Sequence, residues 1–91
     1  MHIQNLTLLL ILSVVSTAYS ATEKPCTTAP ASKWMDHEAV RAKVRALGYR
    51  VADFEIENGC YVVEVRDKDG KEMDLYVDPV DGKIIRSEIE P

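Results

Sequence analysis

From Gly48 onward, apolar residues alternate with polar ones, and turn sequences interrupt the alternation at short intervals. Alternation with a period of two is typical of strands that bury only one face. Asn58-Gly59 separates two such segments, and it favours a two-residue hairpin because both central residues of a type I′ turn need positive φ. Further turns are predicted at residues 68–70 and 79–82. The second half of the chain is therefore predicted to be an antiparallel β-meander.

Four strands are predicted, over residues 49–57, 60–67, 71–78 and 83–89. Every second residue of each strand is expected to face the core. The residues expected on that inner face are Ala52, Phe54, Ile56, Tyr61, Val63, Val65, Met73, Leu75, Val77, Ile85 and Ile89.

A single helix is predicted ahead of the strands. Asp36 is a good N-cap residue, and Gly48 is a typical residue just past a helix C-terminus, so the helix is expected from Asp36 to Leu47. Val40, Val44 and Leu47 recur at the i, i+4, i+7 spacing of one apolar face. The helix and the strands each have one apolar face, so each layer is expected to bury its face against the other. The predicted fold class is α+β, with one N-terminal helix packed on a three- to four-stranded antiparallel β-meander.

The first twenty residues contain no Lys, Arg, Asp or Glu, and Leu8 to Leu12 form an unbroken apolar run. This run is too short to cross a bilayer and is followed by the small residues Ala18 and Ser20, a pattern typical of a signal peptide. Cleavage is predicted between Ser20 and Ala21. The segment has no Lys or Arg near its N-terminus, so an uncleaved anchor is the alternative.

Cleavage would leave an extended arm over residues 21–35, in which Pro25 and Pro30 oppose helix, and a domain over residues 36–91. The arm carries Cys26, and the second cysteine is Cys60. An even number of cysteines in an exported chain predicts a disulfide, with two free thiols as the alternative. The loop so closed has about 35 residues, for which loop entropy gives roughly 3 to 4 kcal/mol of stabilisation.

The net charge is −4, from 11 basic and 15 acidic residues. Nucleic acids are therefore not expected as partners, because phosphate binding requires clustered Lys and Arg. No segment after residue 20 combines a broad apolar face with a basic one, so no stable membrane insertion is expected after cleavage. The predicted localisation is periplasmic or secreted, and the oligomeric state is left open.

Three residues are candidates for contact with a partner: Trp34, Val62 and Tyr76. Val62 and Tyr76, together with Ile84, are expected on the outward face of the sheet among charged residues. Trp34 precedes the helix and is either a binding anchor or a cover for the core, with the core role favoured in a domain of this size.

No motif points to catalysis or to a cofactor. Asp67-Lys-Asp69-Gly70 resembles the start of a calcium loop, but Gly is fourth rather than sixth, so a hairpin turn is predicted instead. His37 is the only histidine after residue 20, and one imidazole is insufficient for an ordinary transition-metal site. The sequence has no serine elbow, paired histidines or phosphate-binding glycine loop, so we expect neither an enzyme, a cofactor nor a metal site.

Several short motifs follow one another along the chain: Gly48-Tyr49-Arg-Val51, Phe54-Glu55-Ile56, Asn58-Gly59-Cys60-Tyr61-Val-Val-Glu64-Val65, Asp67-Lys-Asp-Gly70 and Tyr76-Val-Asp78-Pro79-Val-Asp-Gly82-Lys-Ile84. In their order and spacing they resemble the PepSY domain, over about residues 26–89. The likeness is strongest to small exported versions with a Cys in the arm and Lys33-Trp34-Met35 before the helix. Such domains occur in propeptides of secreted metallopeptidases and in cell-envelope proteins, with a proposed role in binding and restraining peptidases.

The 91 residues include no peptidase domain, so the resemblance implies a stand-alone exported binding module. The leading hypothesis is a protein-binding module that modulates or inhibits peptidases in the cell envelope. The alternatives are an envelope protein that binds a metal ion or small ligand, and a structural domain that associates with itself.

Overall fold

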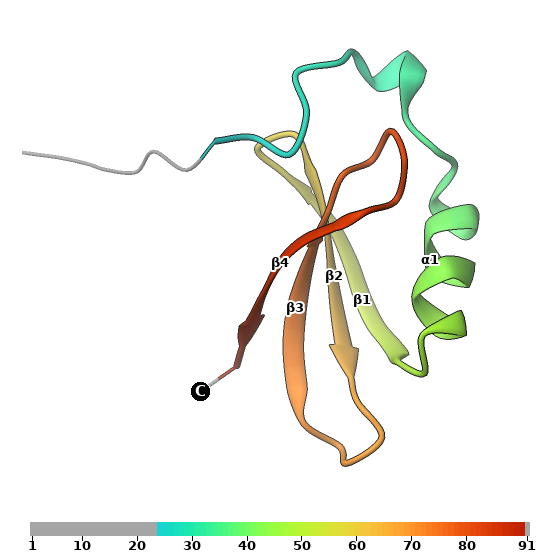
Figure 1. Ribbon diagram of the computed structural model, residues 1–91, viewed down its shortest axis with the longest axis vertical. Coiled ribbons are helices and arrows are strands. Elements are labelled where there is room, and N and C mark those ends of the chain that lie inside the picture. Colours follow the sequence, from blue (N-terminus) through green and yellow to red (C-terminus); the bar gives the residue numbers. More distant parts are fainter. Residues whose placement is uncertain (1–23, 91) are drawn as a thin grey trace, which may run out of the picture.

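The computed structural model describes residues 24–90. The predicted signal segment and the cleavage position between Ser20 and Ala21 lie outside these residues. The elements are a short 3-10 helix η1 (Ala31–Lys33), an α-helix α1 (His37–Ala46) and four strands, β1 (Arg50–Glu57), β2 (Cys60–Arg66), β3 (Glu72–Val77) and β4 (Ile84–Ile89). The strands form one antiparallel sheet in the order β1-β2-β3-β4, with α1 beside β1 (Figure 1). The predicted α+β fold is confirmed. No helix among residues 24–90 has the length and apolar character needed to span a membrane.

Helix α1 begins where the sequence predicts. The Asp36 carboxylate accepts a hydrogen bond from the Glu38 N–H at 3.0 Å and so caps the helix. Val40 and Val44 are buried at 0% and 2% exposure. Leu47, predicted to extend this stripe, is 63% exposed. The helix ends at Ala46, and Leu47 is the C-cap residue, so its side chain lies beyond the part of the helix that covers the sheet.

The core lies between α1 and the two central strands. Its buried residues are Val40, Val44, Tyr61, Val63, Val65, Leu75 and Val77. The residues of β2 and β3 that were predicted to face the core do so. Both strands are paired on each side and keep a regular register with each other, so no residue is displaced from its face. Asn58 and Gly59, with φ of 50° and 72°, make the predicted tight turn between β1 and β2.

The inner face of β1 differs from the prediction. The pairing with β2 shifts between Val51 and Asp53, which leaves Ala52 as an extra residue in a β-bulge. The bulge brings Val51 and Phe54 onto the core side, where both are half-buried, and Ala52 is exposed. Ile56 is 56% exposed because it lies at the far end of an edge strand. Ala52 is therefore not on the predicted inner face, and Ile56 lies on that face, opposite Tyr61, but is not buried.

A second bulge changes β4. The pairing with β3 shifts between Tyr76 and Val77, so that Val77 pairs with Ile84 but Tyr76 pairs with Arg86. One extra residue reverses which side chains face the core. Ile84 therefore packs against the core, although it was predicted to face outward, and Ile85 is 48% exposed. Ile89 is 62% exposed near the end of the strand, so its predicted burial is also wrong.

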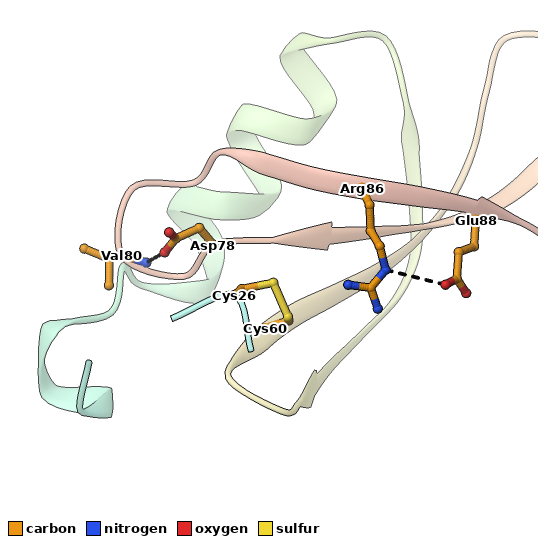
Figure 2. The surroundings of a disulfide bond; sticks show 6 residues. All are labelled: Cys26, Cys60, Asp78, Val80, Arg86 and Glu88. Atoms are coloured by element: carbon orange, nitrogen blue, oxygen red, sulfur yellow. Dashed lines mark hydrogen bonds and ion pairs between the residues drawn. A yellow bond between two sulfur atoms is a disulfide. The ribbon is translucent and has the colours of Figure 1, made fainter. Parts of the chain in front are cut away.

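The N-terminal arm is fixed to the tip of the β1–β2 hairpin by the disulfide Cys26–Cys60, drawn in Figure 2. Its Cα atoms are 4.9 Å apart, within the usual range for a disulfide. The bond confirms the predicted pairing, and the free-thiol alternative does not hold. The arm also contacts the turn itself, because a Cβ atom on Gly59 would lie 2.5 Å from the Thr27 carbonyl oxygen.

Candidate binding surfaces

Trp34 forms part of the cover over the core. Its indole N–H donates to the Ala29 carbonyl at 3.0 Å, and its ring meets the Tyr61 ring edge-on with the centroids 5.4 Å apart. The side chain is half-buried and packs against the core cluster. A partner would therefore meet only part of this ring, and the contacts of Trp34 are those of a core residue.

Tyr61 is the centre of an aromatic cluster with Trp34, His37 and Phe54. Its hydroxyl donates to the Met35 carbonyl at 2.8 Å. The centroid of its ring is 5.0 Å from that of the His37 ring and 4.8 Å from that of the Phe54 ring. Burial, and to a smaller degree the charge of Asp36, raises the pKa of Tyr61. His37 also stacks on Phe54 at 4.8 Å. The His37 imidazole thus packs on aromatic rings. Within residues 24–90, no group of three or more His, Cys, Asp or Glu side chains is arranged to hold a metal ion.

The outer face of the sheet, opposite α1, carries the other two candidate residues. Val62 pairs with Glu55 on one side and with Tyr76 on the other. Val62 lies on the outer face as predicted, but it is buried there, at 8% exposure. It lines a shallow hollow together with acidic residues of three strands and of the segment after β4, namely Asp53, Glu55, Glu64, Asp74 and Glu90.

Tyr76 is held in place by its neighbours on β4. The Arg86 guanidinium lies over the Tyr76 ring, 3.8 Å from its centroid, and the Tyr76 hydroxyl donates to Glu88 at 3.3 Å. Arg86 and Glu88 also form an ion pair of 3.5 Å, shown in Figure 2. Burial, followed by the charge of Glu88, raises the pKa of Tyr76. The half-buried ring is thus a preorganised feature of this face.

The dominant property of the outer face is negative charge. Strand pairing places on it eight acidic residues, Asp53, Glu55, Glu57, Glu64, Glu72, Asp74, Glu88 and Glu90, against three basic residues, Arg50, Arg66 and Arg86. Four of the carboxylates lie directly opposite one another across the four strands, in the order Asp53, Glu64, Asp74, Glu88. Like charges in directly opposed positions destabilise a sheet.

Two carboxyl groups of this face respond to the crowding. The charge of Asp53, together with a side-chain hydrogen bond to it, raises the pKa of Glu55. A side-chain hydrogen bond to Asp74, together with its charge, raises the pKa of Glu90. Neighbouring strands lie about 4.8 Å apart, so a row across four strands extends over about 14 Å. The row therefore forms an extended band of negative charge across the sheet.

The sequence analysis did not find this acidic face. The signal was present, because acidic residues recur at every second position from Asp53 to Glu57 and from Glu72 to Asp74. Without the strand register, however, alternate charges read as an ordinary solvated surface. Only the pairing of the strands shows that these residues share one face.

The carboxylates of the acidic turns accept hydrogen bonds from main-chain N–H groups of their own turns. The Asp67 carboxylate accepts hydrogen bonds from the N–H groups of Asp69 at 2.8 Å and of Lys71 at 2.9 Å. These bonds, that of Lys71 first, lower the pKa of Asp67. Asp78 and Asp81 accept in the same way from the N–H groups of Val80 and Lys83. The predicted hairpin turns are confirmed, and these carboxylates close the turns they belong to.

The chain matches a model of a known protein family. No curated protein matches the chain, and no solved structure matches it. A family model described as "Peptidase propeptide and YPEB domain", PepSY_2, matches residues 5–88, which is most of the chain. The chain therefore belongs to the PepSY family of peptidase propeptide and YPEB domains.

Proposed function

We propose that this protein is an exported, non-enzymatic binding module that restrains or modulates a peptidase in the cell envelope. The observation that carries the proposal is the match to a peptidase propeptide domain over most of the chain. Domains of this family are typically extracellular or periplasmic. The disulfide between Cys26 and Cys60 supports the same location, because such bonds persist in oxidising compartments.

The outer face of the sheet is the surface we assign to this role. The inner face is taken by α1 and the core, so the outer face is the one left for a partner. Its carboxylates suit a basic surface on the partner, since complementary charge speeds association and sets the orientation of the two proteins. The fixed ring of Tyr76 adds an aromatic contact that loses little conformational freedom on binding.

The test is direct inhibition of purified secreted metallopeptidases whose own propeptides contain a PepSY domain. The protein is added to the mature enzymes at micromolar concentration, and both residual activity and binding are measured. We expect inhibition that weakens as ionic strength rises, because the contact is electrostatic. If no such enzyme is bound or inhibited at these concentrations, the peptidase role is wrong.

Two double variants locate the surface. Glu64→Gln with Asp74→Asn removes two charges from the outer face, and Glu38→Gln with Asp69→Asn removes two charges elsewhere. The first pair is expected to weaken binding about tenfold and the second pair to leave it within twofold, by the usual size of charge contributions to association. Equal effects of the two pairs would show that binding uses another surface.

Export is tested separately. Mass spectrometry of the protein secreted by a bacterial host, before and after reduction, is expected to give a chain that begins at Ala21 and gains two hydrogens on reduction. An intact N-terminus would favour the uncleaved anchor.

A further inference from the structure

Strand β4 is an open edge of the sheet. It is the last strand in the order β1-β2-β3-β4, and it lies on the side away from α1 (Figure 1). Two large apolar side chains are exposed on it, Ile85 at 48% and Ile89 at 62%. Unpaired edges with apolar side chains favour pairing with another strand, and proteins usually protect them.

The pairing with β3 shows which main-chain groups face outward. The Glu90 N–H donates to the Glu72 carbonyl at 3.0 Å, so the main chain of Glu90 faces β3. In an antiparallel ladder every second residue faces the same neighbour. Glu88 therefore also faces β3, and Ser87 and Ile89 present their N–H and C=O groups to the open edge.

The sequence of this edge is complementary to itself. When two copies of β4 run antiparallel with Ser87 opposite Ser87, Arg86 of one copy lies opposite Glu88 of the other. This happens twice, once on each side of the two-fold axis. Ser87 becomes a hydrogen-bonded pair, so Arg86 and Glu88 meet at the non-hydrogen-bonded positions, where side chains approach most closely. Ile85 lies opposite Ile89 in the same register.

We propose that β4 pairs antiparallel with β4 of a second copy, which makes a two-fold symmetric dimer with a continuous eight-stranded sheet. The occupant of this edge is thus the same chain, because opposite charges and exposed apolar residues meet their complements only in that register. The Arg86–Glu88 pair within each chain is exchanged for, or shared with, a pair across the interface.

The other edge does not offer this match. Strand β1 carries Asp53, Glu55 and Glu57 on one face, and pairing β1 with itself would oppose carboxylates. Helix α1 also lies beside β1 (Figure 1). A single pair of six-residue strands buries less than the roughly 1,000 Å² of a stable interface, so the dimer is expected to be weak and reversible.

Charge-reversal variants distinguish a contact between two chains from the ion pair within one chain. Arg86→Glu puts Glu opposite Glu in the dimer, and Glu88→Arg puts Arg opposite Arg. Each variant alone breaks both the pair within the chain and the pair between chains. A 1:1 mixture restores opposite charges between the two chains while the pair within each chain stays broken.

The measurement is sedimentation equilibrium of the exported chain purified from the periplasm of a bacterial host. We expect the unchanged protein to dimerise with a dissociation constant below about 1 mM. Each single variant should associate about tenfold more weakly, and the mixture should associate as heterodimers. Arg45→Glu mixed with Glu38→Arg is the matched control, because both positions are on α1, and the mixture should behave like the unchanged protein.

A second variant blocks the edge without changing charge. Ser87→Pro removes an N–H that faces the open edge, and proline is tolerated at such positions. Circular dichroism should show the unchanged fold, and sedimentation should show a monomer. The proposal is overturned if the unchanged protein is monomeric at 1 mM, or if the mixture of Arg86→Glu and Glu88→Arg associates no better than either variant alone.

Discussion

Gly59, in the turn between β1 and β2, is the residue whose replacement the structure tolerates least. Gly59 has φ of 72° and lies against the arm, where a Cβ atom would be 2.5 Å from the Thr27 carbonyl oxygen and 3.0 Å from Pro25 Cβ. Both neighbours belong to a segment fixed by the disulfide, so they cannot easily move away. Gly59 is therefore required twice, for its positive φ and for the space that its missing side chain leaves.

We expect Gly59→Ala to lower the free energy of unfolding by about 2 to 4 kcal/mol, from left-handed strain and steric overlap together. Gly70→Ala is the matched control. Gly70 also has positive φ, 83°, but nothing lies within 4 Å of its Cβ position. Its variant should lose only about 1 to 2 kcal/mol from the backbone strain. Urea unfolding of the two variants side by side measures both, and equal losses would contradict the contact with the arm.

The pKa of Glu55, raised chiefly by the charge of Asp53, leads to a pH-dependent prediction. A carboxyl with a raised folded-state pKa opposes folding when it is ionised, and the penalty disappears below its unfolded pKa, about 4.3. Glu55→Gln should therefore be more stable than the unchanged protein at pH 7 and equal to it at pH 3. Urea midpoints at the two pH values test this. A variant that is less stable at pH 7 would show that Glu55 is not under repulsion.

At the scale of elements, the two edge strands each carry a bulge and the two central strands carry none between them. A bulge needs freedom to bend, which an edge strand has on its unpaired side. The disulfide holds the arm in place, because it joins Cys26 of the arm to Cys60 at the tip of the first hairpin, 34 residues further along the chain.

Removing the disulfide tests how much the arm depends on it. We expect Cys26→Ser with Cys60→Ser to lose roughly 3 to 4 kcal/mol of unfolding free energy, from the entropy of the unfolded chain. The Trp34 indole reports on the arm through its own fluorescence during urea unfolding, since it is the only tryptophan. A loss below about 1 kcal/mol would mean that the contacts of the arm alone hold it, or that the unfolded chain retains structure.

The whole molecule has one covered sheet face and one open acidic face. The open face keeps carboxylates in opposed positions, which costs stability, and a protein keeps such an arrangement where function requires it. The cost and the proposed binding role are two consequences of the same charges. Removing the charges is therefore expected to raise the stability of the fold and to weaken binding to the partner.

The double variant Glu64→Gln with Asp74→Asn should raise the free energy of unfolding by about 1 kcal/mol at low ionic strength, because it removes opposed like charges. Added salt at 0.5 M should reduce the gain, since salt screens exposed charges. The double variant Glu38→Gln with Asp69→Asn is the control and should give no gain. Thermal or urea unfolding in both salt conditions is the measurement, and a destabilised outer-face variant would contradict the repulsion.

The amino-acid sequence by itself determined the helix, the four strands, the turns and the disulfide. These depend on local signals: the cap Asp36, the period of two in β2 and β3, the Asn58-Gly59 turn and an even number of cysteines. The tertiary structure decided which face each edge residue occupies. The bulges at Ala52 and Ile85 arise from how neighbouring strands align, and each reverses the facing of the residue just before it, so that Val51 and Ile84 pack against the core. For the same reason the acidic face, the burial of Val62 and the self-complementary edge of β4 became visible only once the strands were paired.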